Sequence, residues 1–238
     1  MEDKFEFNEG KHVYTLNGKK LYGVTSVLGV IAKPALIQWS AKMAAEYIRD
    51  TGIERTIDGV HYILTQGHLL EEAKSAHRKK KEDAGKKGTD IHAQCEVIIK
   101  HAIAHEGGCL PPSLFHADPL VQKFIDWAIE NKVQFLASEK KMYSREMWVA
   151  GTCDFTCIIN GKRIMGDIKT SSGIYGRDYF LQCAGYILMS EEHGEKYDGS
   201  IIVRLGKDGS FETKESWDLE TDKKGFISAL NLFKVLEQ

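Results

Sequence analysis

The spacing of apolar positions changes along the chain and predicts two regions of different structure. Between about residues 25 and 130, apolar residues recur every three or four positions, which predicts helices. From about residue 137 onward, short runs rich in β-branched and aromatic residues are separated by turn residues, which predicts strands. We therefore expect a single domain with a mainly helical N-terminal portion, residues 1–135, and a sheet core, residues 136–238.

The N-terminal portion begins with a predicted hairpin. Residues Lys4–Lys20 alternate aromatic and polar side chains and contain Asn17-Gly18, a strong signal for a tight turn. Helical spacing starts near Thr25, and an apolar face after Pro34 is formed by Leu36, Trp39, Met43, Ala44 and Tyr47. Further helices are predicted at His68–Glu82, Gly88–His105 and Pro119–Glu130.

The C-terminal portion mixes predicted strands and helices. Strands are predicted at Met142–Ser144, Trp148–Ile159, Arg163–Thr170, Ser200–Leu205 and Ser210–Trp217, and helices at Arg177–Glu192 and Asp222–Leu236. Asn160-Gly161 lies between the second and third strands, which predicts an antiparallel pair. The order of three strands, a helix, two strands and a helix predicts an α/β sheet with a helical N-terminal portion.

The composition favours an intracellular protein. With 238 residues, 42% of them hydrophobic, the chain is long enough for one sizeable core. No stretch approaches the roughly 20 apolar residues that span a bilayer, and the charged start at Met1–Phe5 lacks the apolar core of a signal peptide. We expect a soluble, cytoplasmic protein without a membrane partner.

The five cysteines bear on disulfide formation and metal binding, and the net charge of −2 bears on phosphate binding. The odd cysteine count indicates free thiols rather than a disulfide framework. Cys153 and Cys157 are expected on one face of a strand, either as buried small side chains or as thiolate ligands. Because the chain is slightly acidic overall, any surface that binds phosphate must be local. The basic run Arg78–Lys81, with Lys86 and Lys87 beyond it, is either such a phosphate-binding surface or a solvated helix face.

The residues with the clearest chemistry are Asp154, Asp167 and Lys169. The predicted turn at Asn160-Gly161 pairs the strands that carry the two aspartates, which brings the carboxylates together. A divalent cation relieves their repulsion, and hard oxygen ligands favour Mg²⁺ or Mn²⁺. Lys169 projects from the same strand face as Asp167 and is placed to orient a metal-bound water. The alternative is an ordinary surface salt bridge.

The same segment resembles a known nuclease family. Gly166-Asp167-Ile168-Lys169-Thr170, preceded by Gly151-Thr152-Cys153-Asp154, resembles the core of the PD-(D/E)XK nuclease superfamily. The resemblance is strongest to the branch of RecB-type nuclease domains, CRISPR-associated exonucleases and the mitochondrial genome maintenance exonuclease. Three further features match that branch in order, over roughly residues 20 to 190: Gly88-Thr-Asp-Ile-His92, Glu139 on the first core strand, and Gln182-Cys-Ala-Gly-Tyr186.

The resemblance implies a restriction-endonuclease-like core, a mixed β-sheet flanked by helices. It also implies that one or two Mg²⁺ or Mn²⁺ ions are bound by His92, Asp154, Asp167 and the backbone carbonyl of Ile168. Lys169 is the implied catalytic lysine, with Gln182 and Tyr186 lining the site.

Alternatives remain open for several of these residues. His92 is either a ligand or a structural histidine, and Tyr186 is either a site residue or part of the core. Glu96 could contact the metal through water, hold Lys169, or be solvated. Glu139 could bind a second metal or buttress the sheet.

These observations predict a stand-alone DNA nuclease, an exonuclease acting on single-stranded or end-containing DNA. In this interpretation Lys79, Lys80, Lys81, Lys86 and Lys87 engage DNA phosphates near the site. The main rival is a catalytically silent binding module with the nuclease fold, working with a recombination or replication partner. The CRISPR-associated members of the branch that this chain resembles hold an iron–sulfur cluster with four cysteines, three of them after the core. No cysteine follows Cys183 here, so no iron–sulfur cluster is expected. A hydrolase of small phosphoesters is a more distant rival.

Overall fold

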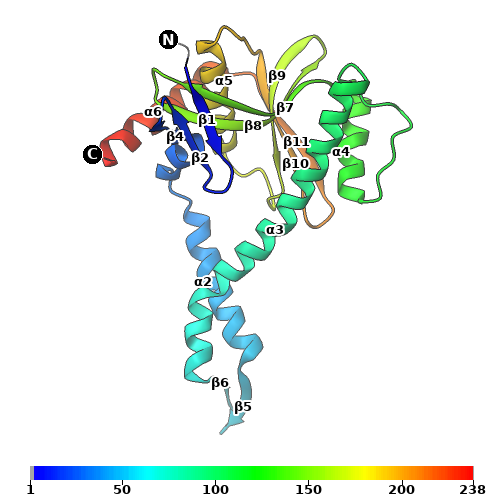
Figure 1. Ribbon diagram of the computed structural model, residues 1–238. Coiled ribbons are helices and arrows are strands. Elements are labelled where there is room, and N and C mark those ends of the chain that lie inside the picture. The colour runs from blue at the N-terminus through cyan, green and yellow to red at the C-terminus, as the bar shows by residue number, and fades with distance from the viewer. Residues whose placement is uncertain (1–2, 238) are drawn as a thin grey trace. The chain divides into compact units, whose positions relative to one another are not determined.

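The computed structural model describes residues 3–237, apart from the side chains of Pro34, Ala35, Lys81 and residues 83–89. The chain divides into two compact units, residues 1–31 together with 91–238, and residues 32–90. The elements, labelled in Figure 1, are β1 (Phe5–Asn8), β2 (Val13–Leu16), β3 (Lys19–Lys20), β4 (Tyr22–Gly23), α1 (Val24–Val27), the 3-10 helix η1 (Leu28–Val30), α2 (Pro34–Thr51), β5 (Ile53–Ile57), β6 (Val60–Leu64), α3 (Gly67–His105), α4 (Pro119–Glu130), β7 (Gln134–Ser144), β8 (Val149–Ile159), β9 (Lys162–Lys169), α5 (Asp178–Glu192), β10 (Gly199–Leu205), β11 (Phe211–Ser216) and α6 (Leu219–Leu236).

The predicted α/β fold class is confirmed. The central sheet has six strands and mixed directions: β9 pairs with β10 in parallel, whereas the β8–β9, β7–β8 and β10–β11 pairs are antiparallel. The predicted order of three strands, a helix, two strands and a helix holds from β7 to α6. The turn at Asn160-Gly161 has positive φ at both residues, as the dipeptide predicts.

The N-terminal portion differs from the prediction in two places. Residues 67–105 form one helix, α3, in place of two helices separated between Glu82 and Gly88. A glycine inside a helix costs only about 1 kcal/mol, so the glycines in this stretch do not end it. The hairpin of β5 and β6 was not predicted, although its turn, Asp58-Gly59, carries the same dipeptide signal as other tight turns.

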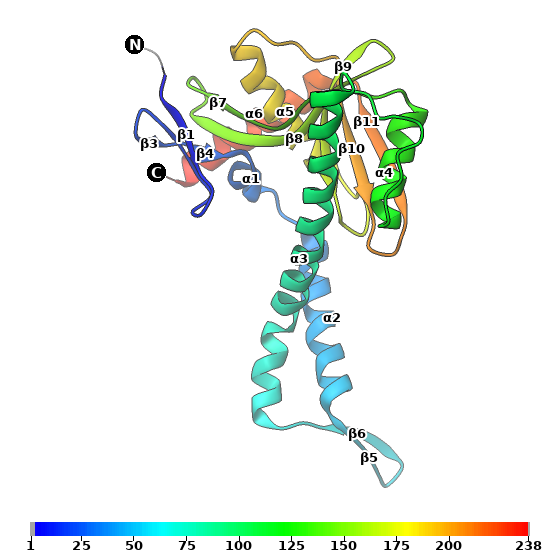
Figure 2. The ribbon, with the colours of Figure 1, turned by 45° about the vertical axis from the view of Figure 1, so that its right-hand side comes forward.

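Two helical layers cover the sheet of the first unit. One apolar cluster packs the second half of α3 and α4 against the sheet, and the other packs α1, α5 and α6 against its opposite face (Figure 2). A third, smaller cluster lies under the N-terminal strands β1–β3. Among the described residues, none of the helices has the length and apolar composition needed to cross a membrane.

The side chains of β8 change faces in the middle of the strand. Cys153 packs with the α5 and α6 cluster, whereas Phe155 and Cys157 pack with the α3 and α4 cluster. Glu139 of β7 lies across from this point and has a φ of 49°, a left-handed conformation that is uncommon outside glycine. The expectation that Cys153 and Cys157 share a face is therefore wrong, because strict alternation fails at this irregularity. Both thiols are free and buried.

Candidate active site

The candidate site lies where β8 loses its partner on one edge. β7 runs along one edge of β8, so β9 and β4 must share the other. Along that edge β9 pairs with residues 155–159 and β4 with residues 149 and 150. Residues 151–154 between them have no strand partner there, and Asp154 ends this gap.

Asp154 fills part of the gap with its carboxylate. Its Oδ2 accepts a hydrogen bond of 2.6 Å from the backbone N–H of Ile168 on β9. The side chain therefore replaces the strand pairing that ends at Phe155 and Gly166. Burial raises the pKa of Asp154, while the charge of Lys169 and the Ile168 N–H act in the opposite direction.

Asp167 and Lys169 project from β9 toward α5 and form an ion pair. The Lys169 ammonium lies 2.9 Å from Oδ1 and 2.7 Å from Oδ2 of Asp167, and donates to Gln182 Oε1 at 3.3 Å. The Gln182 amide donates to Asp167 Oδ1 at 3.2 Å and to the Tyr186 hydroxyl at 2.9 Å. A continuous polar chain thus runs from the buried carboxylate to Tyr186, itself buried against the apolar cluster.

The charged groups of this hydrogen-bonded network shift one another's pKa values. Burial raises the pKa of Asp167 to about 6. The positive charge of Lys169 acts to lower this pKa, and the negative charge of Asp154 acts to raise it. Burial alone would lower the pKa of Lys169, but the charges of Asp167 and Asp154 raise it above its ordinary value. Lys169 therefore remains a cation at neutral pH, and it compensates two carboxylates.

His92 brings α3 to the same place. Its Nδ1 lies 3.6 Å from Asp154 Oδ2. Burial lowers the pKa of His92, while the charge of Asp167 and the backbone of Ile168 act in the opposite direction. A lowered pKa favours the neutral ring, which has a lone pair that can bind a cation.

These donors fit a divalent metal ion in their chemistry. The Asp167 side chain is 1% exposed, and its Oδ2 lies 2.7 Å from the Lys169 ammonium. The one positive charge of Lys169 leaves the two carboxylates of Asp154 and Asp167 with a net negative charge, which a divalent cation would compensate. Two carboxylates and a neutral imidazole are ligands that Mg²⁺ or Mn²⁺ accepts. Within the described residues, no three His, Cys, Asp or Glu side chains converge closely enough to form a ready metal cluster.

Two further glutamates lie near the site without a direct contact to Lys169. Glu96 accepts a hydrogen bond from Lys100. Of the three alternatives for Glu96, this contact does not support the one in which it holds Lys169. Burial and the charges of Asp154 and Glu96 raise the pKa of Glu139 to about 7. Its neighbours Ser138 and Lys140 pair with Phe155 and Cys153, so Glu139 lies opposite Asp154 in the β7–β8 pair.

The predicted basic surface lies in the other compact unit. The side chains of Lys79 and Lys80 are exposed there, and Lys80 Nζ lies 4.0 Å from Glu46. The side chains of Lys81, Lys86 and Lys87 lie outside the described residues. The role of this run in binding phosphates stays a prediction.

The structure adds Tyr179 to the residues around Lys169. The ammonium lies 5.4 Å from the centre of the Tyr179 ring, within the range of a cation–π contact. Tyr179 precedes Gln182 by one helical turn on α5, so helical spacing from Gln182 could have identified it.

Comparison with known proteins leaves the family unassigned. No family model matches the sequence, and no curated protein matches it. Among solved structures, the crystal structure of SSO0001 is similar, with 15% identity and a TM-score of 0.28, over 60% of this chain and 74% of that one. This TM-score is too low to assign a fold family or a function.

Proposed function

We propose that the protein is a metal-dependent DNA nuclease that hydrolyses phosphodiester bonds, an exonuclease on single-stranded or end-containing DNA. The observation that carries the proposal is the buried Asp167 carboxylate, which pairs with Lys169 beside a second carboxylate, Asp154, and the His92 ring. A simple structural salt bridge would not need Asp154, Gln182 and His92 around it. Phosphodiester hydrolysis needs such a concentration of carboxylates beside one fixed cation.

Each side chain has a separate task in this proposal. His92, Asp154 and Asp167 would hold Mg²⁺ or Mn²⁺, which supplies an activated water and charge compensation when bound. Lys169 orients the attacking water and offsets the charge that develops on the phosphate. Gln182 fixes the ammonium by accepting its hydrogen bond, and Tyr186 fixes the Gln182 amide in turn. The Ile168 N–H keeps Asp154 turned toward β9.

The test uses DNA labelled separately at its 5′ and 3′ ends, single-stranded and duplex, with Mg²⁺, Mn²⁺ or EDTA. Lys169→Ala is compared with the wild type and with Lys224→Ala, which removes an exposed lysine of α6. We expect metal-dependent cutting that Lys169→Ala reduces at least about 100-fold and Lys224→Ala leaves unchanged. A circular single strand that resists cutting would identify an exonuclease, and the labels would give its polarity.

Two outcomes would contradict the proposal. If Lys169→Ala cut DNA at the wild-type rate, the candidate site would not be the place where the phosphodiester bond is hydrolysed. Binding of DNA without any cutting, in either metal, would favour the catalytically silent module.

A further inference from the structure

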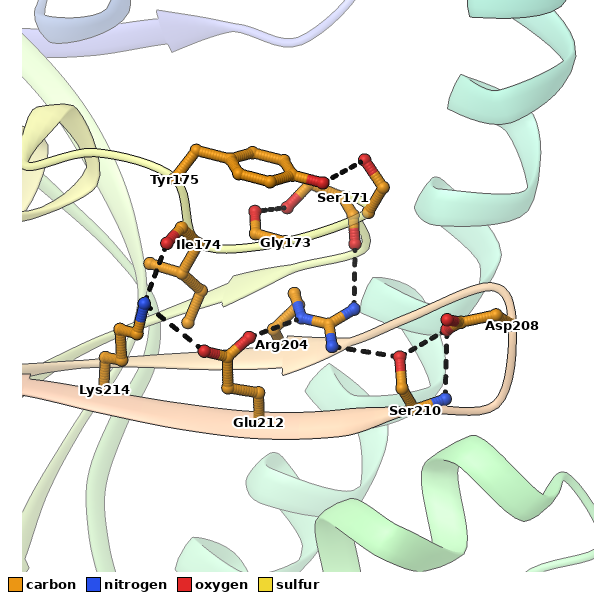
Figure 3. A network of polar contacts seen from close by, with 10 residues as sticks. Ser171, Gly173, Ile174, Tyr175, Arg204, Asp208, Ser210, Glu212 and Lys214 are labelled. Atoms are coloured by element: carbon orange, nitrogen blue, oxygen red, sulfur yellow. Dashed lines mark hydrogen bonds and ion pairs between the residues drawn. The ribbon is translucent and has the colours of Figure 1, made fainter.

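The loop between β9 and α5, residues 170–177, joins two parts of the candidate site. Lys169 precedes its first residue, and α5, which begins just after it, carries Gln182. Any side chain that this loop exposes to solvent is therefore close in sequence to Lys169 and to Gln182, whose amide oxygen accepts a hydrogen bond from the Lys169 ammonium. Its polar contacts reach across to β10 and β11 (Figure 3).

Arg204 fastens the start of the loop. Arg204 is 6% exposed, lies near the end of the apolar strand β10 and pairs in register with Lys169. The guanidinium donates to the Ser171 carbonyl at 3.3 Å, to Ser210 Oγ at 2.9 Å and to Glu212 at 3.1 Å. A buried guanidinium with three partners is a rigid support, because breaking any one of them leaves a buried charge incompletely satisfied.

Lys214 and Ile174 fasten the middle of the loop. The Lys214 ammonium donates to the Ile174 carbonyl at 2.9 Å and lies 3.4 Å from Glu212. The Ile174 side chain is buried in the cluster under α5 and α6. At the far end, Arg177 Nε donates to Asp222 at 2.8 Å. The loop is thus held at both ends and at its middle.

Tyr175 stands on this fastened loop and points into water. It is 79% exposed. Its ring lies against Gly173, where an added Cβ would come within 2.7 Å of the ring, and its hydroxyl donates to Ser172 Oγ at 3.1 Å. The ring is therefore exposed and held in one orientation, which is unusual for a surface side chain that has only solvent to meet.

We propose that Tyr175 is a base-stacking platform for the single strand whose phosphate lies at Lys169. The inference rests on the proposed function, because it takes DNA as the substrate. Every base has a π-face, so a fixed ring on the loop that follows Lys169 can hold a strand without reading its sequence. Pre-ordering by Ser172, Gly173, Arg204 and Lys214 lowers the entropy lost when a base stacks.

The test measures binding of a fluorescent single strand in EDTA, where metal-dependent cutting is blocked. A second strand has the same length and charge but abasic sites in place of bases. Tyr175→Ala is compared with Tyr175→Phe, which keeps the ring, and with Phe115→Ala, which removes an aromatic side chain that is 80% exposed on another loop.

We expect Tyr175→Ala to raise the Kd for the ordinary strand roughly tenfold and to leave the Kd for the abasic strand unchanged. Phe115→Ala should bind both strands as the wild type does. Tyr175→Phe keeps the ring but loses the hydrogen bond to Ser172, so it should raise the Kd for the ordinary strand by less than Tyr175→Ala does. An equal effect of Tyr175→Ala on the two strands, no effect on either, or a wild type that binds no single strand would overturn the inference. Cutting assays decide the proposed function separately: a wild type that stacks bases through Tyr175 but cuts no DNA refutes the nuclease and leaves the platform standing.

Discussion

The Asp154 carboxylate and the Ile168 N–H are joined by a 2.6 Å hydrogen bond at the point where β8 and β9 part. One carboxylate oxygen thus has a structural task in closing the sheet. The negative charge serves a different purpose, because any oxygen acceptor could satisfy the N–H. The two tasks of Asp154 can be separated by mutation.

Asp154→Asn should keep the fold and lose the proposed chemistry. The amide oxygen can accept the Ile168 N–H, so we expect a free energy of unfolding within about 1 kcal/mol of the wild type. Loss of the charge should reduce DNA cutting at least about 100-fold. Urea denaturation and the labelled-DNA assay measure the two effects. Asp154→Ala, which cannot accept the hydrogen bond, should be clearly less stable than Asp154→Asn, and equal stabilities would contradict the structural task.

Gly166→Ala should destabilise the protein, because the new methyl group has no room. A Cβ at this position would lie 2.1 Å from the ring of Phe155, which is fully buried. Overpacking of this kind costs about 1–3 kcal/mol. Gly29→Ala is the control, since nothing lies within 4 Å of a Cβ there. Adding Phe155→Leu to Gly166→Ala should recover part of the loss in a double-mutant cycle, and strict additivity would place the strain elsewhere.

Asp118→Ala should weaken the start of α4. The Asp118 carboxylate accepts from the N–H of Leu120 at 2.8 Å and of Val121 at 3.3 Å, which caps the helix before Pro119. Removing such a cap costs about 1 kcal/mol. The urea midpoint should fall without a change in the slope of the transition. Asp118→Asn retains a capping oxygen and should stay near the wild type; a drop as large as that of Asp118→Ala would argue against capping.

Glu195→Gln should show that the negative charge of Glu195 stabilises the folded protein at neutral pH and no longer does so in acid. Partial burial acts to raise the pKa of Glu195, but hydrogen bonds from Lys140 and Tyr197 and the charge of Arg163 lower it below its ordinary value of 4.5. A lowered folded-state pKa stabilises the fold above the unfolded-state pKa, and this stability is lost as the pH falls through the folded value. We expect Glu195→Gln to be less stable than the wild type by up to about 1 kcal/mol at pH 7. The difference should vanish below the folded-state pKa; a difference that persists there would point to packing.

Local chemistry made part of the fold predictable from the sequence. Pro119 and the turn at Asn160-Gly161 act through their own backbone preferences, so their elements begin and turn where expected. The start of β7 at Gln134 and the face change after Cys153 depend on pairing between distant strands, which no local pattern reports. α3 continues through its glycines because a glycine inside a helix costs only about 1 kcal/mol.

The candidate site was predictable to a similar extent. The i, i+2 spacing of Asp167 and Lys169 places both side chains on one strand face, and the i, i+4 spacing of Gln182 and Tyr186 places both on one helix face. The role of Ile168 as a hydrogen-bond donor to Asp154 was not predictable, because it arises only where two strands separate. Arg204 was missed as well, since a single arginine ending an apolar strand resembles an ordinary edge residue until its partners are known.

The gap in β8 also constrains the order of folding. One side of the gap is bounded by Gly23, which pairs with Ala150, and the other by Gly166, which pairs with Phe155. A growing chain on the ribosome cannot close this gap until both an early strand and a late strand are available. Chains truncated before β9 would carry Asp154 without Asp167 and Lys169, so the candidate site could not assemble in them.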